Sequence, residues 1–136
     1  MRFDTKIALI IRSDLESWQK VNVAAFLASG VAAQFPECIG EPYEDGSGTT
    51  YARLFAQPVL VYGADGAGLV RALDRALSRG VMPAVYTREM FVTNNDDDNR
   101  AVVKAVDRSA LDLVGIALRA ERKTVDKIVD KLKFLE

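Results

Sequence analysis

Compact apolar runs alternate along the chain with stretches in which apolar residues recur at helical spacing. Compact runs bounded by charged or turn residues are typical of buried strands, and they occupy residues 6–12, 57–63, 82–87 and 111–118. Between them, apolar positions recur every three or four residues, as they do on the buried face of a helix. These helical stretches are 18–35, a second helix after Asp65, one or two turns over 100–106, and a last helix from about Thr124.

The order of strands and helices predicts βαβ units, which place helices on both faces of a sheet. We therefore expect one domain over residues 1–136, of the α/β class: a three-layer α/β/α sandwich around a four-stranded mixed sheet. Residues 36–50 are rich in Pro and Gly and are predicted to form a long loop. Loops of that length are uncommon without a role or local structure, and whether this one gates a cleft stays open.

Charge and composition narrow the chemistry. Eighteen basic and nineteen acidic side chains give a net charge of -1, which disfavours a partner bound through a phosphate backbone. Histidine is absent, so any acid–base chemistry must use carboxylates, Lys, Tyr, Cys38 or water. A single cysteine fits a reducing compartment, and no apolar stretch approaches the roughly 20 residues of a membrane span. These features predict a cytoplasmic protein without a membrane segment.

Two local motifs have a structural interpretation and a chemical one. Gly63, Gly66 and Gly68 follow a strand and open a helix, where a phosphate can bind. Their order does not match the dinucleotide fingerprint, and Asp65 would repel an anion, so a capped turn is the interpretation we favour. Residues Asp96–Asp98 are carboxylates that a hard cation could use, but consecutive side chains splay apart, so we favour a solvated loop.

Two further signals are weaker still. Cys38 lacks a histidine to lower its pKa, which disfavours a nucleophilic role. A basic strip near the end of the chain could contact RNA; it consists of Lys123, Lys127, Lys131 and Lys133. Asp126 and Asp130 interrupt the strip, and such mixtures are usual on an exposed helix face.

Several segments together resemble the type 2 peptidyl-tRNA hydrolases. They are KIALIIRSDL (6–15), KVNVAAFLASG (20–30), GVMPAVYTREMFVTN (80–94), LVGIAL (113–118) and VDKIVDKLKFL (125–135). They occur in the family's order, at compatible spacing, and cover most of the chain. The resemblance extends in particular to bacterial proteins of unknown function that share this scaffold, and it implies the fold of that family.

The resemblance also implies candidate catalytic residues, because that family hydrolyses the ester between a peptide and tRNA. Lys20 matches the family's first lysine and Thr93 its threonine, while Glu89 stands where the family has an aspartate. We expect these side chains to converge where the first helix begins and the third strand ends. A Lys–Glu pair there could orient a water or a hydroxyl. The structural alternative is a solvated ion pair beside a turn threonine.

The expected cleft differs from that of the family in ways that change its chemistry. Its lining is predicted to include Asn22 in place of a second lysine, Phe26 in place of a glutamine, and also Arg88 and Asn94. Lost cations weaken both tRNA binding and the stabilisation of an oxyanion. Phe26 makes the pocket more apolar and favours a smaller or less polar ligand.

We therefore predict a ligand-binding or weakly hydrolytic cleft on this scaffold. True peptidyl-tRNA hydrolysis is one alternative, and an interaction protein that uses its first helix or a sheet edge is another. If the protein is an enzyme, the resemblance implies a hydrolase acting on carboxylic esters. We expect the protein to bind an unknown small ligand and to use neither a metal nor a cofactor. Binding of tRNA is possible but disfavoured. A homodimer is also possible for a scaffold of this size.

Overall fold

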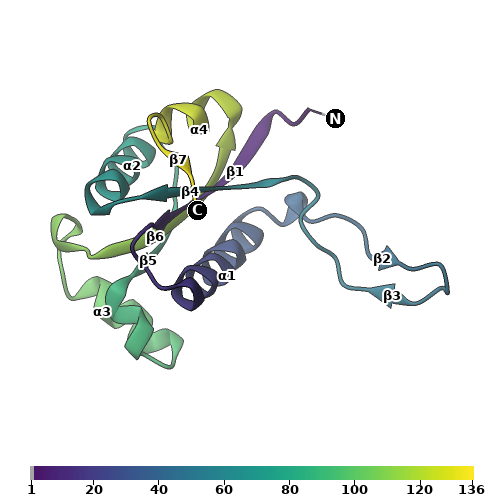
Figure 1. Cartoon of the computed structure of the whole chain (residues 1–136), viewed down its shortest axis with the longest axis horizontal. Helices are drawn as coiled ribbons and strands as arrows, with labels where there is room; N and C mark the ends of the chain where they lie inside the picture. The colour runs from purple at the N-terminus through teal and green to yellow at the C-terminus, as the bar shows by residue number, and fades with distance from the viewer. Residues whose placement is uncertain (1) are drawn as a thin grey trace.

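The structure, a computed structural model, describes residues 2–136 as one sheet with helices on both faces (Figure 1). The strands of this sheet are β1 (Thr5–Arg12), β4 (Val59–Ala64), β5 (Ala84–Thr87), β6 (Leu113–Glu121) and β7 (Lys133–Phe134). The helices are α1 (Ser17–Gln34), α2 (Gly66–Ser78), α3 (Asp96–Lys104) and α4 (Arg122–Ile128). Short 3-10 turns are η1 (Pro36–Cys38), η2 (Arg88–Val92) and η3 (Arg108–Ala110). The predicted α/β class with a mixed sheet is confirmed.

The directions of the strands place the carboxyl ends of three of them at one edge of the sheet. The strand order is β5-β6-β1-β4-β7. β1 and β4 pair in parallel, whereas β6 runs antiparallel to both β1 and β5. The carboxyl ends of β1, β4 and β5 therefore lie at the same edge, where β6 begins. In open α/β sheets this edge is where ligands bind.

Two apolar clusters form the core, one on each face of the sheet. Alternate side chains of β1 enter opposite clusters: Ile10 packs on the face covered by α2 and α4, and Leu9 packs on the face covered by α1. Both are almost fully buried. A strand covered on both faces needs apolar residues at every position, which explains the unbroken apolar run over 7–11 between Lys6 and Arg12.

The sheet has five strands rather than the four predicted, because the end of the chain adds β7. Apolar spacing suggested that the last helix continues towards Leu132, but α4 ends at Ile128. Lys131 then adopts a positive φ of 74°, which turns the chain back along β4. There the Phe134 ring stacks on the Tyr62 ring with centroids 5.1 Å apart. A two-residue strand is too short to produce a period-two pattern.

The predicted loop over 36–50 contains local structure of its own. After η1, strands β2 (Tyr43–Glu44) and β3 (Thr50–Tyr51) form a separate antiparallel hairpin. We call residues 39–55 the hairpin arm; it extends away from the sheet in Figure 1. Asp45 organises its tip by accepting hydrogen bonds from the backbone N–H of Ser47 and of Thr49, at 2.8 and 3.0 Å.

The polar segment at 93–98, predicted as a loop, contains the start of α3. The side chain of Asn95 caps this helix by accepting a hydrogen bond from the Asp98 N–H at 2.8 Å. Carboxylates in a first turn are stabilised by the helix dipole, and Asp96 and Asp97 also form ion pairs with Arg100. These contacts give the acidic run a structural explanation. Within residues 2–136, no helix combines the length and the apolar character needed to cross a membrane.

Candidate functional site: an aromatic cleft beside the first helix

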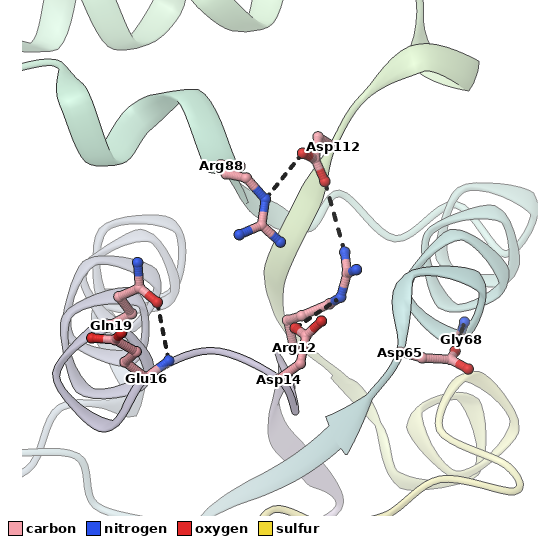
Figure 2. Close-up of polar contacts among 8 residues, drawn as sticks. All are labelled: Arg12, Asp14, Glu16, Gln19, Asp65, Gly68, Arg88 and Asp112. Carbon is pink, nitrogen blue, oxygen red and sulfur yellow. Dashed lines mark hydrogen bonds and ion pairs between the residues drawn. The ribbon is translucent and has the colours of Figure 1, made fainter.

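Helices α1 and α2 both begin at the carboxyl edge of the sheet (Figure 2). Glu16 is the N-cap of α1, and its backbone N–H donates to Gln19 Oε1 at 3.0 Å. Asp65 caps α2 as predicted, accepting from the Gly68 N–H at 2.8 Å. The Asp65 carboxylate already accepts from an N–H at the start of α2. The glycine-containing turn between β4 and α2 is therefore a capped strand-to-helix turn, as favoured from the sequence.

A paired-charge cluster occupies this edge between the two helix starts (Figure 2). Asp112, just before β6, lies 3.1 Å from Arg88 Nε and 3.7 Å from Arg12 Nη1. Arg12 Nε also lies 3.2 Å from Asp14 Oδ1. Arg88, expected in the cleft, is therefore directed at Asp112, and it is absent from the lining of the cleft described next. Two arginines and two carboxylates neutralise each other, so this cluster holds the edge together.

A cleft of about 370 Å³ lies beside α1, between that helix and η2. We call it the aromatic cleft. Its first wall comes from Trp18, Asn22 and Phe26, which follow one another at intervals of four residues and so share one side of α1. Its base includes Tyr86 at the end of β5 and Phe91 in η2. The volume falls within the range of small-molecule pockets.

Aromatic rings of the cleft contact each other in a continuous series. The centroids lie 5.8 Å apart for Trp18 and Phe91, 5.2 Å for Phe91 and Tyr86, and 5.6 Å for Tyr86 and Phe26. The Trp18–Phe91 and Phe26–Tyr86 pairs are edge-to-face and the Tyr86–Phe91 pair is tilted. Edge-to-face pairs are each favourable by about 0.5–1.5 kcal/mol beyond burial. Trp18 and Phe26 nevertheless remain 59% and 51% exposed. The two outer rings of the series therefore present surface to the cleft, whereas Tyr86 is buried at its base.

A single polar contact crosses this series. The Asn22 side-chain amide donates to the Tyr86 hydroxyl oxygen at 3.1 Å. Burial raises the pKa of Tyr86 above its usual value, and the hydrogen bond from Asn22 lowers it by less. The hydroxyl is therefore protonated at neutral pH. It accepts from Asn22 and keeps its own proton to donate.

The second wall of the cleft is polar. It comes from the segment around the start of α3 and includes Thr93, Asn94, Asn95 and Asn99. The Thr93 hydroxyl is held in place, because it donates to the Met90 carbonyl at 3.0 Å and contacts the Asn99 side chain. Side-chain amides carry both donors and acceptors. The cleft thus faces a ligand with rings on one side and amides on the other.

The predicted catalytic residues do not share one cavity. Thr93 lines the aromatic cleft, while Lys20 lines another hollow near the end of the chain, with its Nζ 3.5 Å from the Glu136 carbonyl. Glu89 is exposed in η2 and lines neither of these cavities. A catalytic role for the three residues stays a prediction. Of the predicted cleft residues, Asn22, Phe26 and Asn94 do lie together.

Two other candidate positions lie outside the cleft. Cys38 is buried at the base of the hairpin arm, and burial raises the pKa of its thiol, which keeps it protonated at neutral pH. No residue of the hairpin arm is among those that line the aromatic cleft. Among residues 2–136, no three His, Cys, Asp or Glu side chains form a group that could hold a metal ion.

Residues of the cleft that the sequence did not identify come mainly from its base and its polar wall. Tyr86 and Phe91 lie in segments whose apolar character gave no sign of which face they use. Asn95 and Asn99 could not be assigned to the cleft, because the polar composition around them predicts a solvated loop. Trp18 could have been identified from the sequence, because it lies four positions from Asn22 and eight from Phe26, a spacing that puts all three on one side of a helix.

Comparisons with known proteins identify relatives without an assigned activity. A family model described as a protein of unknown function (DUF2000) matches residues 5–136. A solved structure of a protein of unknown function from Agrobacterium tumefaciens is similar, with 47% sequence identity and a TM-score of 0.97. The similarity covers 99% of this chain and 100% of that one. None of the curated proteins matches.

These findings correct the family expected from the sequence segments. The matching family model covers nearly the whole chain and is not that of the type 2 peptidyl-tRNA hydrolases. The similar solved structure is likewise described only as a protein of unknown function. The resemblance rested on short apolar strands and helix turns, which unrelated α/β proteins share because the same burial rules shape them. The assignment to that family was therefore wrong.

Proposed function

The chain belongs to the DUF2000 family of proteins of unknown function, and from the geometry of its aromatic cleft we propose that it binds a small, ring-containing organic ligand. The observation that carries this proposal is the half-exposed pair Trp18 and Phe26, which frame a hollow of ligand size. Large aromatic side chains are costly to leave in water. A planar ligand placed between them would cover both.

The polar wall supports a ligand with a few hydrogen-bonding groups at its rim. Asn94 lies opposite the rings, and the Tyr86 hydroxyl keeps a proton to donate. Apolar surfaces with a small number of convergent polar groups are typical of small-molecule sites. Simple binding fits this arrangement better than hydrolysis, because the residues expected to activate a nucleophile do not meet at the cleft.

Replacing Phe26 with alanine is expected to weaken binding about tenfold, since one aromatic contact of roughly 1.4 kcal/mol is lost. Trp18 is the only tryptophan of the chain, so saturable quenching of its fluorescence reports occupancy of the cleft directly. The measurement is a fluorescence titration of the native chain with a panel of small ring-containing compounds. A compound that quenches Trp18 saturably is then titrated into the Phe26→Ala variant and into a control variant.

The matched control is Val21→Ala, on the same helix. Val21 is 70% exposed and does not line the cleft, so this variant should bind as the native chain does. The proposal is wrong if no compound quenches Trp18 saturably. It is also wrong if Phe26→Ala and Val21→Ala bind a quenching compound equally well.

Self-association through the hairpin arm is a second candidate function. An isolated two-stranded hairpin is marginal in water, yet this arm leaves Tyr43 and Tyr51 each 53% exposed as a cross-strand pair. A second copy of the chain packed on these rings would stabilise the arm. We expect sedimentation velocity to show a dimer that Tyr43→Ser combined with Tyr51→Ser converts to monomer. A native chain that is monomeric at high concentration would exclude this candidate.

A further inference from the structure

A second and larger hollow, of about 590 Å³, lies where the starts of α1 and α2 meet the end of the chain. We call it the basic hollow. Its charged lining consists of Lys20, Asp65, Arg71, Lys131, Lys133 and Glu136. These residues come from three separate parts of the sequence, so the fold itself gathers them. The volume again falls within the range of about 300–1,000 Å³ for small-molecule pockets.

The lining of this hollow carries more positive than negative side chains, with four cations against Asp65 and Glu136. Among residues 2–136, no Asp or Glu side chain lies within ion-pair distance of these four cations, and Lys20 Nζ lies 3.5 Å from the Glu136 backbone oxygen. Of the two carboxylates in the lining, Asp65 is engaged as the cap of α2. By contrast, the arginines at the nearby sheet edge are paired with Asp14 and Asp112. Like charges gathered around one concavity repel each other, and an anion bound between them removes that repulsion.

The backbone at the hollow is shaped in an unusual way. Lys131 is the one non-glycine residue of 2–136 with a positive φ, a conformation that is unfavourable for most side chains and that glycine adopts freely. This turn carries Lys131 and Lys133 to the rim. On the facing strand, Gly63 has no room for a side chain, because a Cβ there would lie 2.7 Å from Ser13 Oγ. The same Cβ would lie 3.3 Å from Leu135 Cδ1 and 3.5 Å from Leu135 Cα, so the end of the chain fits closely against β4.

We propose that the basic hollow binds a small ligand through a di- or triphosphate group. Four cations opposed by Asp65 and Glu136 match a group with several negative charges better than a single carboxylate. Lysines bind phosphate as point charges, and Arg71 adds a planar pair of donors. This site is separate from the aromatic cleft, since Lys20 and Asn22 are two positions apart and point to different sides of α1.

Neighbouring cations provide a matched control, because they have other surroundings. Arg75 and Arg79 continue along α2 and line a different hollow, which also contains Asp126 and Asp130. Arg75 Nη1 donates to the carbonyls of Ile128 and Asp130, at 3.4 and 3.1 Å, and so ties α2 to the end of α4. Arg79 is exposed and contacts only α2 itself, through Arg75 O and Ser78 Oγ. Replacing Arg79 removes one surface charge without altering the basic hollow.

The test is calorimetric titration of the full chain with inorganic triphosphate at low ionic strength. The double variant Arg71→Ala with Lys133→Ala should weaken binding by at least about tenfold, while Arg79→Ala should change it by less than about twofold. Added salt should weaken binding to the native chain. A nucleoside triphosphate is titrated in parallel to show which part of a ligand the hollow recognises. If it binds more tightly than inorganic triphosphate, the ligand is a nucleotide. If the two bind equally, the hollow recognises the phosphates alone.

A further variant separates binding from folding. Lys131→Gly removes one charge and relieves the positive φ, so it should raise the melting temperature and yet weaken triphosphate binding. Glu136→Gln should have the opposite effect on affinity and strengthen it. The proposal is overturned if the native chain does not bind triphosphate at low salt. It is equally overturned if Arg79→Ala weakens binding as much as the double variant, because the charge of the whole surface would then be responsible.

Discussion

Replacing Ile116 with alanine is expected to lower the free energy of unfolding by about 4 kcal/mol. Ile116 lies in the middle of β6, paired with Ile10 on one side and Val85 on the other. It is fully buried in the cluster under α2 and α4. Alanine leaves a cavity that the paired strands on both sides cannot close. The substitution therefore loses the free energy of burying the removed atoms and also incurs the cost of the cavity.

Chemical denaturation followed by circular dichroism measures this change. Val92→Ala is the control, because Val92 is 89% exposed and its loss should change stability by less than about 0.5 kcal/mol. A loss of under about 1 kcal/mol for Ile116→Ala would mean that the two helices do not cover this face as the fold requires.

Much of this fold was predictable because burial imposes simple patterns. The unbroken apolar run at 7–11 is typical of a strand covered on both faces. Asp65 is a favourable N-cap for the second helix, and Gly80, with a positive φ of 72°, lies directly after its C-cap Arg79. Short additions escaped prediction: β7 contains two residues, and its formation depends on the turn at Lys131 and on ring stacking with Tyr62. Such contacts are long-range and leave no local pattern.

The residues of the candidate site were predictable from the sequence only where their spacing along the first helix shows which side of the helix they occupy. Lys20 and Asn22 were both expected in one cleft, yet residues two positions apart on a helix do not share a side. Asn22 and Phe26, four positions apart, do share one, and both line the aromatic cleft. The ion pair of Arg88 with Asp112 could not be read from the sequence, because Asp112 is distant in the chain and becomes adjacent only when β5 pairs with β6.

Replacing Gly115 with valine is expected to lower the free energy of unfolding by roughly 3 kcal/mol, because β6 is closely covered by α1. A Cβ at Gly115 would lie 2.5 Å from Val23 Cγ1 and 2.9 Å from Leu27 Cδ1. Both side chains belong to α1 and are buried, so neither can rotate away. The helix itself has to move outwards to accommodate the new side chain.

That movement should be visible at the aromatic cleft, because α1 carries its first wall. As α1 shifts, the contact between Trp18 and Phe91 loosens, and the fluorescence emission of Trp18 should move to longer wavelength as water reaches the ring. Gly46→Val is the matched control: Gly46 lies at the tip of the hairpin arm, and a Cβ there would meet nothing within 4 Å. It should leave both stability and emission unchanged. If Gly115→Val lowers stability without altering Trp18 emission, the core and the cleft are not coupled through α1. If both change together, the close approach of α1 to β6 sets the shape of the ligand site.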